Sequence, residues 1–405
     1  MSEPGEILLR ICARPGADHG ARLATLDPVG WEQLAALASE QRVTALLAQA
    51  LANVEDELAV PPAVARQMDE QVERERLYTL NQSLALVRML ALLADAGLEP
   101  ICLKGVRLAH LDYPRPELRP MRDLDLLLEP ADAERAQELL LASGRYKIAD
   151  GRPAYGIEAS HQLPPLVDTE RKVMIELHHR LDAKDFARER DLLALMRAQP
   201  ENTTVFDRTV CVPTAHACLL HIVAHAALQH LFDNGPVVLA DVHYLAANDE
   251  LDWHLLMQDA QALGLDKALG LIAALARELG AEWLDRIPDS LPEPSAECLS
   301  VVRAAMLSPS AGRDRQRFLR RMQHDRGASA TARTTLDAML HPDPDWLAAI
   351  VGVGPGNPAR WLGYPVWLAQ RARRYRDSRS DPTAIDLAAA RSRLRDWLLA
   401  QGSES

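Results

Sequence analysis

Aromatic side chains are scarce in this sequence, where Phe, Trp and Tyr together make up 4% of 405 residues. Ala and Leu, which are strong helix formers, are abundant instead, so the composition predicts a mostly helical protein. A chain of this length usually folds as two or three domains, and its hydrophobic share of 48% is sufficient for large cores.

Cysteine is also rare, and the five cysteines are scattered without any CxxC pair. This usage argues against a disulfide scaffold and is typical of reduced thiols. The first residues lack the basic and apolar regions of a signal peptide, and no uncharged apolar stretch reaches the ~20 residues that span a bilayer. We therefore expect a soluble, cytoplasmic protein without a membrane partner.

Basic residues are in the minority: 45 Lys and Arg face 57 Asp and Glu, which gives a formal net charge of -12. Proteins that follow a nucleic-acid backbone usually carry a basic face, so this balance argues against a nucleic-acid partner. A GxSxG nucleophile motif is absent. The Gly-rich run GVGPGNP contains Pro355 and Pro358 and lacks the Lys-Ser/Thr ending of a Walker loop, so we interpret it as a turn.

Helical and strand-like patterns divide the chain into four regions. Residues 1–92 are helical, and the last helix is expected to end near Gly97. Residues 93–205 hold short apolar runs typical of strands, two of which could form a hairpin through Asp168–Arg171. Helices return over 206–290, and 291–405 is an Arg-rich helical region. We predict an α+β fold that is predominantly helical, with a small mixed sheet on which the N-terminal helices pack.

The strongest chemical signal is Asp123-Leu124-Asp125, which begins an apolar run. Residues i and i+2 of a strand point to the same face, so the two carboxylates would project together. Two adjacent carboxylates repel each other, but their arrangement becomes favourable when a divalent cation lies between them. The alternative interpretation is an exposed amphipathic edge strand.

A second signal is Lys104-Gly105, which follows a short apolar run and precedes a helical pattern. A turn from strand to helix presents backbone N–H groups to an anion, and Lys104 adds a point charge suited to phosphate. The alternative is a plain connector in which Lys104 is solvated.

Three segments, LKGVRLAHLDYP, LRPMRDLDLLLEP and VMIELHHRL, together resemble the uncharacterised nucleotidyltransferase family of the DNA polymerase β-like superfamily. The shared features are the Lys-Gly turn, a Tyr-Pro loop, an Arg before an Asp-x-Asp strand, and a later strand ending in Glu-Leu-His. The segments LLHIVAHAALQH and VVLADVHYLAANDELDW resemble it too, so the likeness spans roughly residues 30–275. It implies a nucleotidyltransferase core at 93–205 and a helical domain at 206–290 that lines the cleft.

The resemblance implies a metal site made by two aspartates on one strand and a third acidic residue on a neighbouring strand. Asp123 and Asp125 match the pair, and Glu176 in VMIELHH is our choice for the third. Asp168 is a less favoured candidate. We therefore expect these three residues to be catalytic and to bind Mg²⁺ or Mn²⁺.

The resemblance also implies that Lys104, Gly105 and Arg119 bind the nucleotide. Lys104 stands where the superfamily usually has a small residue, so its charge could replace some backbone contacts to the triphosphate. Arg122 could supply a fork to phosphate oxygens, and a salt bridge to a nearby carboxylate is its alternative role.

Three histidines are candidates for lining the substrate site. His178 shares the face of Glu176 if that strand continues, and His221 and His225 lie four residues apart on one helix. The segment HIVAH lacks the Glu of a zinc-peptidase HExxH, which argues against zinc. A buried, hydrogen-bonded structural role is the alternative for each.

These features predict a metal-dependent nucleotidyltransferase that moves a nucleoside monophosphate from a nucleoside triphosphate such as ATP to an acceptor. The acceptor could be a small molecule, or a protein or peptide. The alternative is a catalytically silent nucleotide-binding or helical interaction protein that retains the nucleotidyltransferase fold. Metal-dependent turnover of nucleotide discriminates these hypotheses.

We predict that Asp123→Ala and Asp125→Ala each abolish nucleotidyl transfer while the fold is retained. Removing one of two adjacent carboxylates relieves repulsion, so the melting temperature without metal is expected to stay level or rise. Transfer of labelled nucleotide and thermal melting are the measurements. Full activity in both variants would place the metal site elsewhere.

Overall fold

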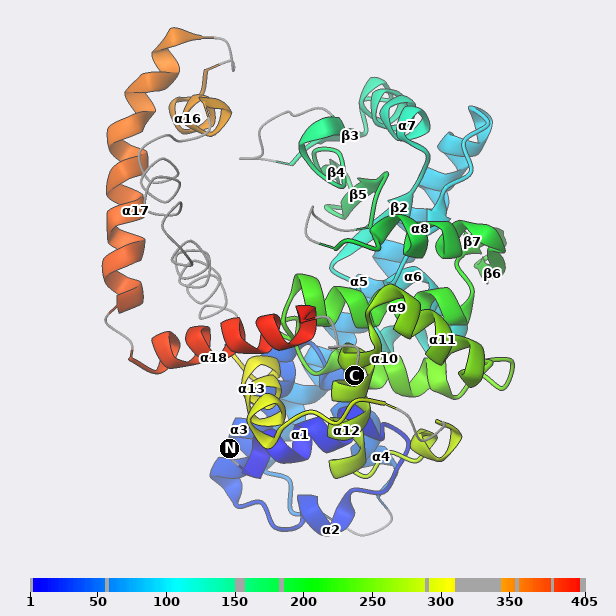
Figure 1. Cartoon of the computed structure of the whole chain (residues 1–405), viewed down its shortest axis with the longest axis vertical. Coiled ribbons are helices and arrows are strands. Elements are labelled where there is room, and N and C mark those ends of the chain that lie inside the picture. The colour runs from blue at the N-terminus through cyan, green and yellow to red at the C-terminus, as the bar shows by residue number, and fades with distance from the viewer. Residues whose placement is uncertain are drawn as a thin grey trace.

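The computed structural model describes residues 3–54, 58–149, 157–181, 186–287, 291–309, 344–353, 357–379 and 382–400. Figure 1 shows a small sheet packed with helices at one end of the molecule, and the helices of residues 3–52 at the opposite end. The predicted α+β class, predominantly helical with one small mixed sheet, is confirmed.

Helices make up most of the described chain. The N-terminal helices are α1 (Glu3–Ala13), α2 (Gly20–Leu23), α3 (Pro28–Gln41), α4 (Thr44–Ala52) and α5 (Pro62–Asp95). Those within the core are α6 (Gly105–Arg107), a π-helix at Leu108–Asp112, α7 (Pro130–Ala142) and α8 (Glu189–Ala198). The later helices are α9 (Ala215–Ala224), a π-helix at His225–Gln229, α10 (Val237–Ala246), α11 (Trp253–Leu263), α12 (Asp266–Glu278), α13 (Ala296–Met306), α16 (Pro344–Val351), α17 (Tyr364–Arg379) and α18 (Pro382–Leu399).

The main sheet has the strand order β1-β2-β5-β4-β3. Its strands are β1 (Ile101–Cys102), β2 (Asp123–Leu127), β3 (Tyr146–Ile148), β4 (Leu166–Asp168) and β5 (Met174–His178). Strands β2 and β5 run parallel, and the other neighbours are antiparallel. The predicted hairpin through Asp168–Arg171 is confirmed, and its two strands are β4 and β5.

A second, two-stranded sheet was not expected from the sequence. It consists of β6 (Glu201–Val205) and β7 (Arg208–Val212), which pair antiparallel directly before α9. Its sequence ENTTVFDRTVCV has two runs rich in Thr and Val on either side of a short turn, which is typical of a hairpin.

The two faces of β2 and β5 have opposite character. Leu124, Leu126, Ile175 and Leu177 are fully buried on one face, where they share a hydrophobic cluster with α5 and α7. Because side chains alternate along a strand, the residues between them, Asp125 among them, point to the other face. The leucines thus fix the orientation of the strands and present the polar side chains to the opposite side.

Two hydrophobic cores hold the molecule together. The smaller core joins the sheet to α7 and the second half of α5. The larger core joins α1, α3 and α4 to α9–α13, and α18 adds Leu394 and Leu398. The expectation that the N-terminal helices pack on the sheet is therefore right only for α5, since α1, α3 and α4 pack on the helical region instead.

Helix α5 is the one described helix that is long and apolar enough to cross a membrane, judged by length and composition alone. Its apolar segment also serves as a core element, because Leu86, Met89 and Leu93 are fully buried beneath the sheet. Of the apolar window, 44% is buried in this way.

A polar bridge connects the sheet region to the helical region. Arg119 precedes β2 and binds Asp241 of α10 through two contacts, Nε to Oδ1 at 2.6 Å and Nη2 to Oδ2 at 2.9 Å. The Tyr113 hydroxyl also donates to Asp241 Oδ1 at 2.7 Å. Asp241 is almost fully buried, so both donors compensate the desolvation of its carboxylate.

We predict that Asp241→Ala lowers the free energy of unfolding by about 3–5 kcal/mol, because it leaves the Arg119 guanidinium partly buried without its carboxylate. Urea denaturation measures this. Asp259→Ala is the matched control, since Asp259 of α11 forms a more exposed pair with His216 and is expected to contribute about 1 kcal/mol or less. Equal losses in the two variants would contradict the structural role of the bridge.

Candidate active site

A cleft of about 360 Å³ lies between the polar face of the sheet and the helical region. The sheet side contributes residues of the β1–α6 turn, β2 and β5, and the opposite wall comes from α9, the following π-helix and α10. Most of the predicted site residues line it, namely Lys104, Gly105, Arg119, Arg122, Asp123, Asp125, Glu176, His178 and His225.

The register of β2 and β5 brings the acidic residues together. Asp125 is paired with Glu176 across the parallel strands, and Asp123 lies two residues earlier on the same face. His178 ends β5 on that face. The i, i+2 spacing read from the sequence therefore does place carboxylates from two neighbouring strands on one wall of the cleft.

Asp125, Glu176 and His178 form the most compact group. One ligand atom from each lies within 4.8 Å of the others. His178 Nε2 is 2.7 Å from Asp125 Oδ1 and 3.5 Å from Glu176 Oε2. His178 is thus part of this group together with two of the predicted ligands, whereas Asp123 lies on the same wall outside it.

The carboxylates strongly influence one another. Burial, together with the charges of Asp125 and Glu176, raises the pKa of Asp123 to about 7. Burial alone would also raise the pKa of Asp125, but the Lys104 ammonium and the hydrogen bond with His178 hold it well below its usual range. The site therefore holds its carboxylates close together in a largely buried setting, where a bound cation would favour their ionised forms.

Lys104 occupies the turn in a conformation that is unusual for its residue type. Its backbone has φ +43°, in the left-handed region that favours glycine. Its Nζ lies 3.5 Å from Asp125 Oδ1. Burial lowers the pKa of Lys104, but Asp125, Asp123 and Glu176 more than offset this and raise it. The strained backbone conformation of Lys104 thus places its ammonium group beside the acidic cluster.

Gly105 begins α6 where a side chain has no room. A Cβ at this position would lie 2.6 Å from Cγ of Met121, a fully buried residue. The close approach of the turn to the segment before β2 therefore requires glycine.

The two arginines differ in their surroundings. Arg119 lines the cleft, but two of its nitrogens are bound to Asp241, so its guanidinium is already engaged. Arg122 is exposed at the mouth beside Asp123, and its backbone carbonyl accepts from the Tyr78 hydroxyl at 3.4 Å.

Asp168, the less favoured third acid, has a different task. Its Oδ1 accepts from the backbone N–H groups of Glu170 and Arg171, both at 2.9 Å, within the β4–β5 turn. It stabilises the hairpin, and it is not among the residues that line the cleft.

The predicted histidines are not equivalent. His178 and His225 line the cleft, whereas His221 is fully buried and is not among the lining residues. Neither ring nitrogen of His221 has a hydrogen-bond partner within the described ranges. Burial, and next the charge of Lys104, lower the pKa of His221 to about 3, so this ring is neutral.

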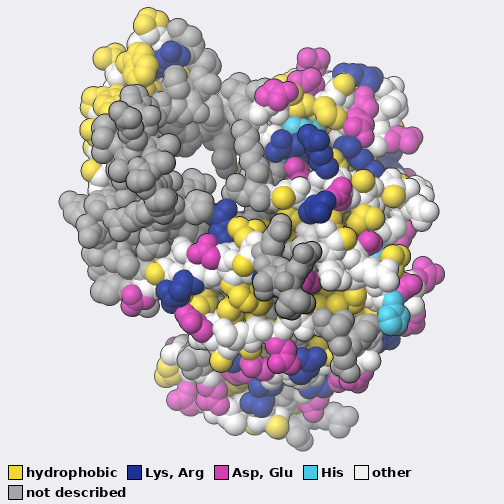
Figure 2. Space-filling model, viewed as in Figure 1, with side chains coloured by type: hydrophobic (Ala, Val, Ile, Leu, Met, Phe, Trp, Pro, Cys, Tyr) yellow, Lys and Arg dark blue, Asp and Glu magenta, His cyan; other side chains and the backbone are white. Residues whose placement is uncertain are grey.

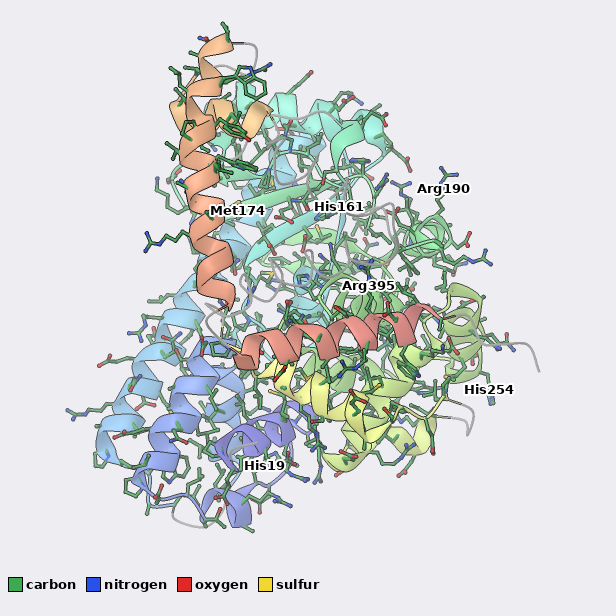
Figure 3. All side chains as sticks on the ribbon, turned by 60° about the vertical axis from the view of Figure 1, so that its left-hand side comes forward. His19, His161, Met174, Arg190, His254 and Arg395 are labelled. Atoms are coloured by element: carbon green, nitrogen blue, oxygen red, sulfur yellow. The ribbon has the colours of Figure 1, made fainter. Side chains whose placement is uncertain are left out.

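Several further lining residues were not predicted from the sequence, among them His161, Gln162 and Asp241. His161, labelled in Figure 3, packs its ring against His178 with centroids 5.5 Å apart. Asp241 had a signal, because an acid inside the apolar helix sequence VVLADVHYL requires a buried partner. The segment before β4 offered no comparable pattern.

A comparison with known protein families shows to which family this chain belongs. The model of the family described as uncharacterised nucleotidyltransferase matches residues 27–281. The chain belongs to this family. The match confirms the predicted resemblance and covers the sheet, the cleft and the helical wall opposite the carboxylates. No curated protein and no solved structure matches the chain.

The residues present fit a divalent cation. Carboxylate oxygens of Asp125 and Glu176 are hard ligands of the kind that Mg²⁺ and Mn²⁺ prefer, and the His178 nitrogen is better suited to Mn²⁺ than to Mg²⁺. Burial and the neighbouring carboxylates raise the pKa of Asp123, and a cation bound beside it would favour its ionised form.

We predict that Asp123→Asn changes the pH dependence of stability in metal-free buffer. A folded pKa of about 7 lies above the unfolded value, so the folded wild type binds more protons and loses stability as pH rises from about 4 through 7. The variant lacks this loss and is expected to melt a few degrees higher than wild type at pH 8, with little difference at pH 4. If the stability of wild type and variant changed identically with pH, the pKa of Asp123 would not be raised in the folded protein.

Asp125→Asn is the informative comparison. It removes a charge that Lys104 and His178 both contact, so we expect it to lower the melting temperature. This corrects the expectation from sequence that removing either carboxylate leaves metal-free stability level or higher, which now applies to Asp123 only.

Proposed function

We propose that this chain is a metal-dependent nucleotidyltransferase that transfers a nucleoside monophosphate from a nucleoside triphosphate to an acceptor. The observation that carries the proposal is the placement of Asp123, Asp125 and Glu176 on one face of two adjacent parallel strands, at the wall of a cleft. Membership of the nucleotidyltransferase family supports the same reaction class.

Each group has a defined part in this reaction. Asp123, Asp125 and Glu176 would hold Mg²⁺ or Mn²⁺, which stabilises charge developing on the phosphoryl oxygens. Lys104 lies beside them and supplies a positive charge for the triphosphate, while Gly105 lets the turn that carries Lys104 pack closely against Met121 before β2. Arg122, exposed at the mouth, is placed to meet the outer phosphates.

Arg119 is better assigned to positioning than to phosphate binding. Its bonds to Asp241 fix the segment that leads into β2 and connect it to α10 on the opposite wall. A phosphate would have to compete with that buried carboxylate for the guanidinium.

The acceptor is proposed to be a small molecule, or a protein or peptide. On the face shown in Figure 2, Lys and Arg side chains are interspersed with Asp and Glu, which does not favour a nucleic-acid acceptor. The alternative of a catalytically silent binding protein is disfavoured by the joint presence of three carboxylates and Lys104 around one cleft.

The proposal is tested by incubating the protein with each α-labelled nucleoside triphosphate, Mg²⁺ or Mn²⁺, and an extract containing small molecules and proteins. We expect label to move to one acceptor class with release of pyrophosphate, and to be lost on chelation of the metal. Asp123→Ala and Asp125→Ala are the inactive controls. Nucleotide binding without transfer in any extract would favour the silent binding protein.

We predict opposite effects of Lys104→Ala on two ligands. Without nucleotide, Mn²⁺ should bind more tightly, because the ammonium that now neutralises Asp125 is gone. A non-hydrolysable ATP analogue with Mg²⁺ should bind about ten-fold more weakly, since a charge-assisted contact of about 1.5 kcal/mol is lost. Titration calorimetry measures both.

Lys104→Gly is the matched control for the strained turn. It removes the same charge and also relieves the left-handed backbone, so its stability should exceed that of Lys104→Ala while its affinities agree with it. Unchanged affinities in both variants would remove Lys104 from the nucleotide site.

A further inference from the structure

The wall opposite the carboxylates has an unusual backbone. A π-helix occupies His225–Gln229, and the next turn holds Leu231 at φ +45° and Phe232 at φ +62°. Bulky residues rarely adopt the left-handed region, and π-helical turns and such strain both concentrate at functional sites. His225 and His230, at the two ends of this segment, line the cleft.

A chain of polar contacts runs from the cleft into the interior through these residues. His225 Nε2 lies 3.1 Å from His230 Nε2, and His230 Nδ1 lies 3.2 Å from Asp233 Oδ1. Asp233 is fully buried and forms an ion pair with Arg391 of α18, with Nη2 2.9 Å from Oδ2. The same arginine nitrogen donates to the His230 carbonyl at 2.7 Å.

This chain fixes the tautomers of both rings. A carboxylate only accepts hydrogen bonds, so His230 Nδ1 must donate to Asp233. In a neutral His230 ring, Nε2 is then an acceptor, and His225 Nε2 must carry the proton that joins the two rings. His225 Nδ1 is left with its lone pair, since the one hydrogen bond of the His225 ring among the described residues is made by Nε2.

We propose that His225 is the general base for the acceptor, and that His230 and Asp233 hold it in the required tautomer. This proposal rests on the proposed function. The hydroxyl oxygen of the acceptor forms a bond to the α-phosphorus, the bond from phosphorus to the β-phosphate bridging oxygen breaks, and pyrophosphate leaves. The hydroxyl proton passes to His225 Nδ1 and later to solvent. The acceptor is therefore an alcohol, from a small molecule or a Ser, Thr or Tyr side chain, bound against the helical wall.

The electrostatics agree with this role. Burial, and next the charge of Lys104, lower the pKa of His225 well below its ordinary value, so its ring is neutral and weakly basic before nucleotide binds. Triphosphate bound beside Lys104 would add negative charge near the ring and make proton transfer to it more favourable. His221, one turn earlier, is sealed from the cleft and has no such access.

The first test reads the tautomers directly and needs no acceptor. Long-range ¹H–¹⁵N correlation spectra of histidine-labelled protein should show His225 protonated at Nε2 and bare at Nδ1. His230→Gln and Asp233→Asn should each return His225 to a mixture of tautomers, while His216→Gln, which removes a His–Asp pair outside the cleft, should not. A wild-type His225 protonated at Nδ1 would overturn the proposal.

The second test measures single-turnover transfer from α-labelled ATP to the acceptor fraction identified in the extract. His225→Ala should lose about 10²–10⁴-fold in rate while its affinity for a non-hydrolysable ATP analogue stays within two-fold. Added imidazole should restore part of the rate to His225→Ala and none to Asp125→Ala. Transfer by His225→Ala at the wild-type rate would overturn the proposal.

The two proposals fail in distinguishable ways. Absence of transfer by the wild type would overturn the proposed nucleotidyltransferase function, and the spectra would still report whether the relay orients His225. Transfer by the wild type at a rate that does not depend on His225 would establish nucleotidyl transfer and contradict the role of His225 as its general base.

Discussion

Electrostatic repulsion among three carboxylates on two adjacent strands is the constraint around which this structure is organised. Asp123, Asp125 and Glu176 share one face because the leucines and isoleucine between them are buried on the other. Their repulsion is only partly offset by Lys104, whose ammonium contacts Asp125 from a strained turn. The packing of the two apolar cores thus compensates for this repulsion and keeps together a wall of acidic side chains that a cation could bind.

The position of the cleft follows from the same constraint. It lies between the region of the sheet and the helical region, so the carboxylates of Asp123, Asp125 and Glu176 stand at the boundary between the two. The bridge between Arg119 and Asp241 crosses this boundary. It ties the entry of β2 to α10, and apolar side chains of the sheet region such as Leu103, Tyr113 and Leu127 also pack in the larger core with the helices.

Local patterns predicted much of this arrangement. Period-2 spacing identified β2 and the shared face of Asp123 and Asp125, and helical periodicity identified α5 with its end near Gly97. Contacts between distant residues could not be predicted in this way. Arg119 and Asp241 are 122 positions apart, and no local pattern shows that the arginine is already bound to a carboxylate. The β6–β7 hairpin was missed although its runs rich in Thr and Val were visible, because helical signals on both sides dominated the interpretation.

The partnership between Arg391 and the wall of the cleft has a consequence for the order of folding. His230 and Asp233 are synthesised long before Arg391, which follows His230 by 161 positions. A nascent chain can complete its sheet and acidic cluster early, since domains fold largely from the N-terminus onward during synthesis. Until α18 emerges from the ribosome, Asp233 lacks its guanidinium partner and the histidine wall remains unfinished. Vectorial synthesis therefore separates the time at which the acidic cluster forms from the time at which the histidine wall is complete.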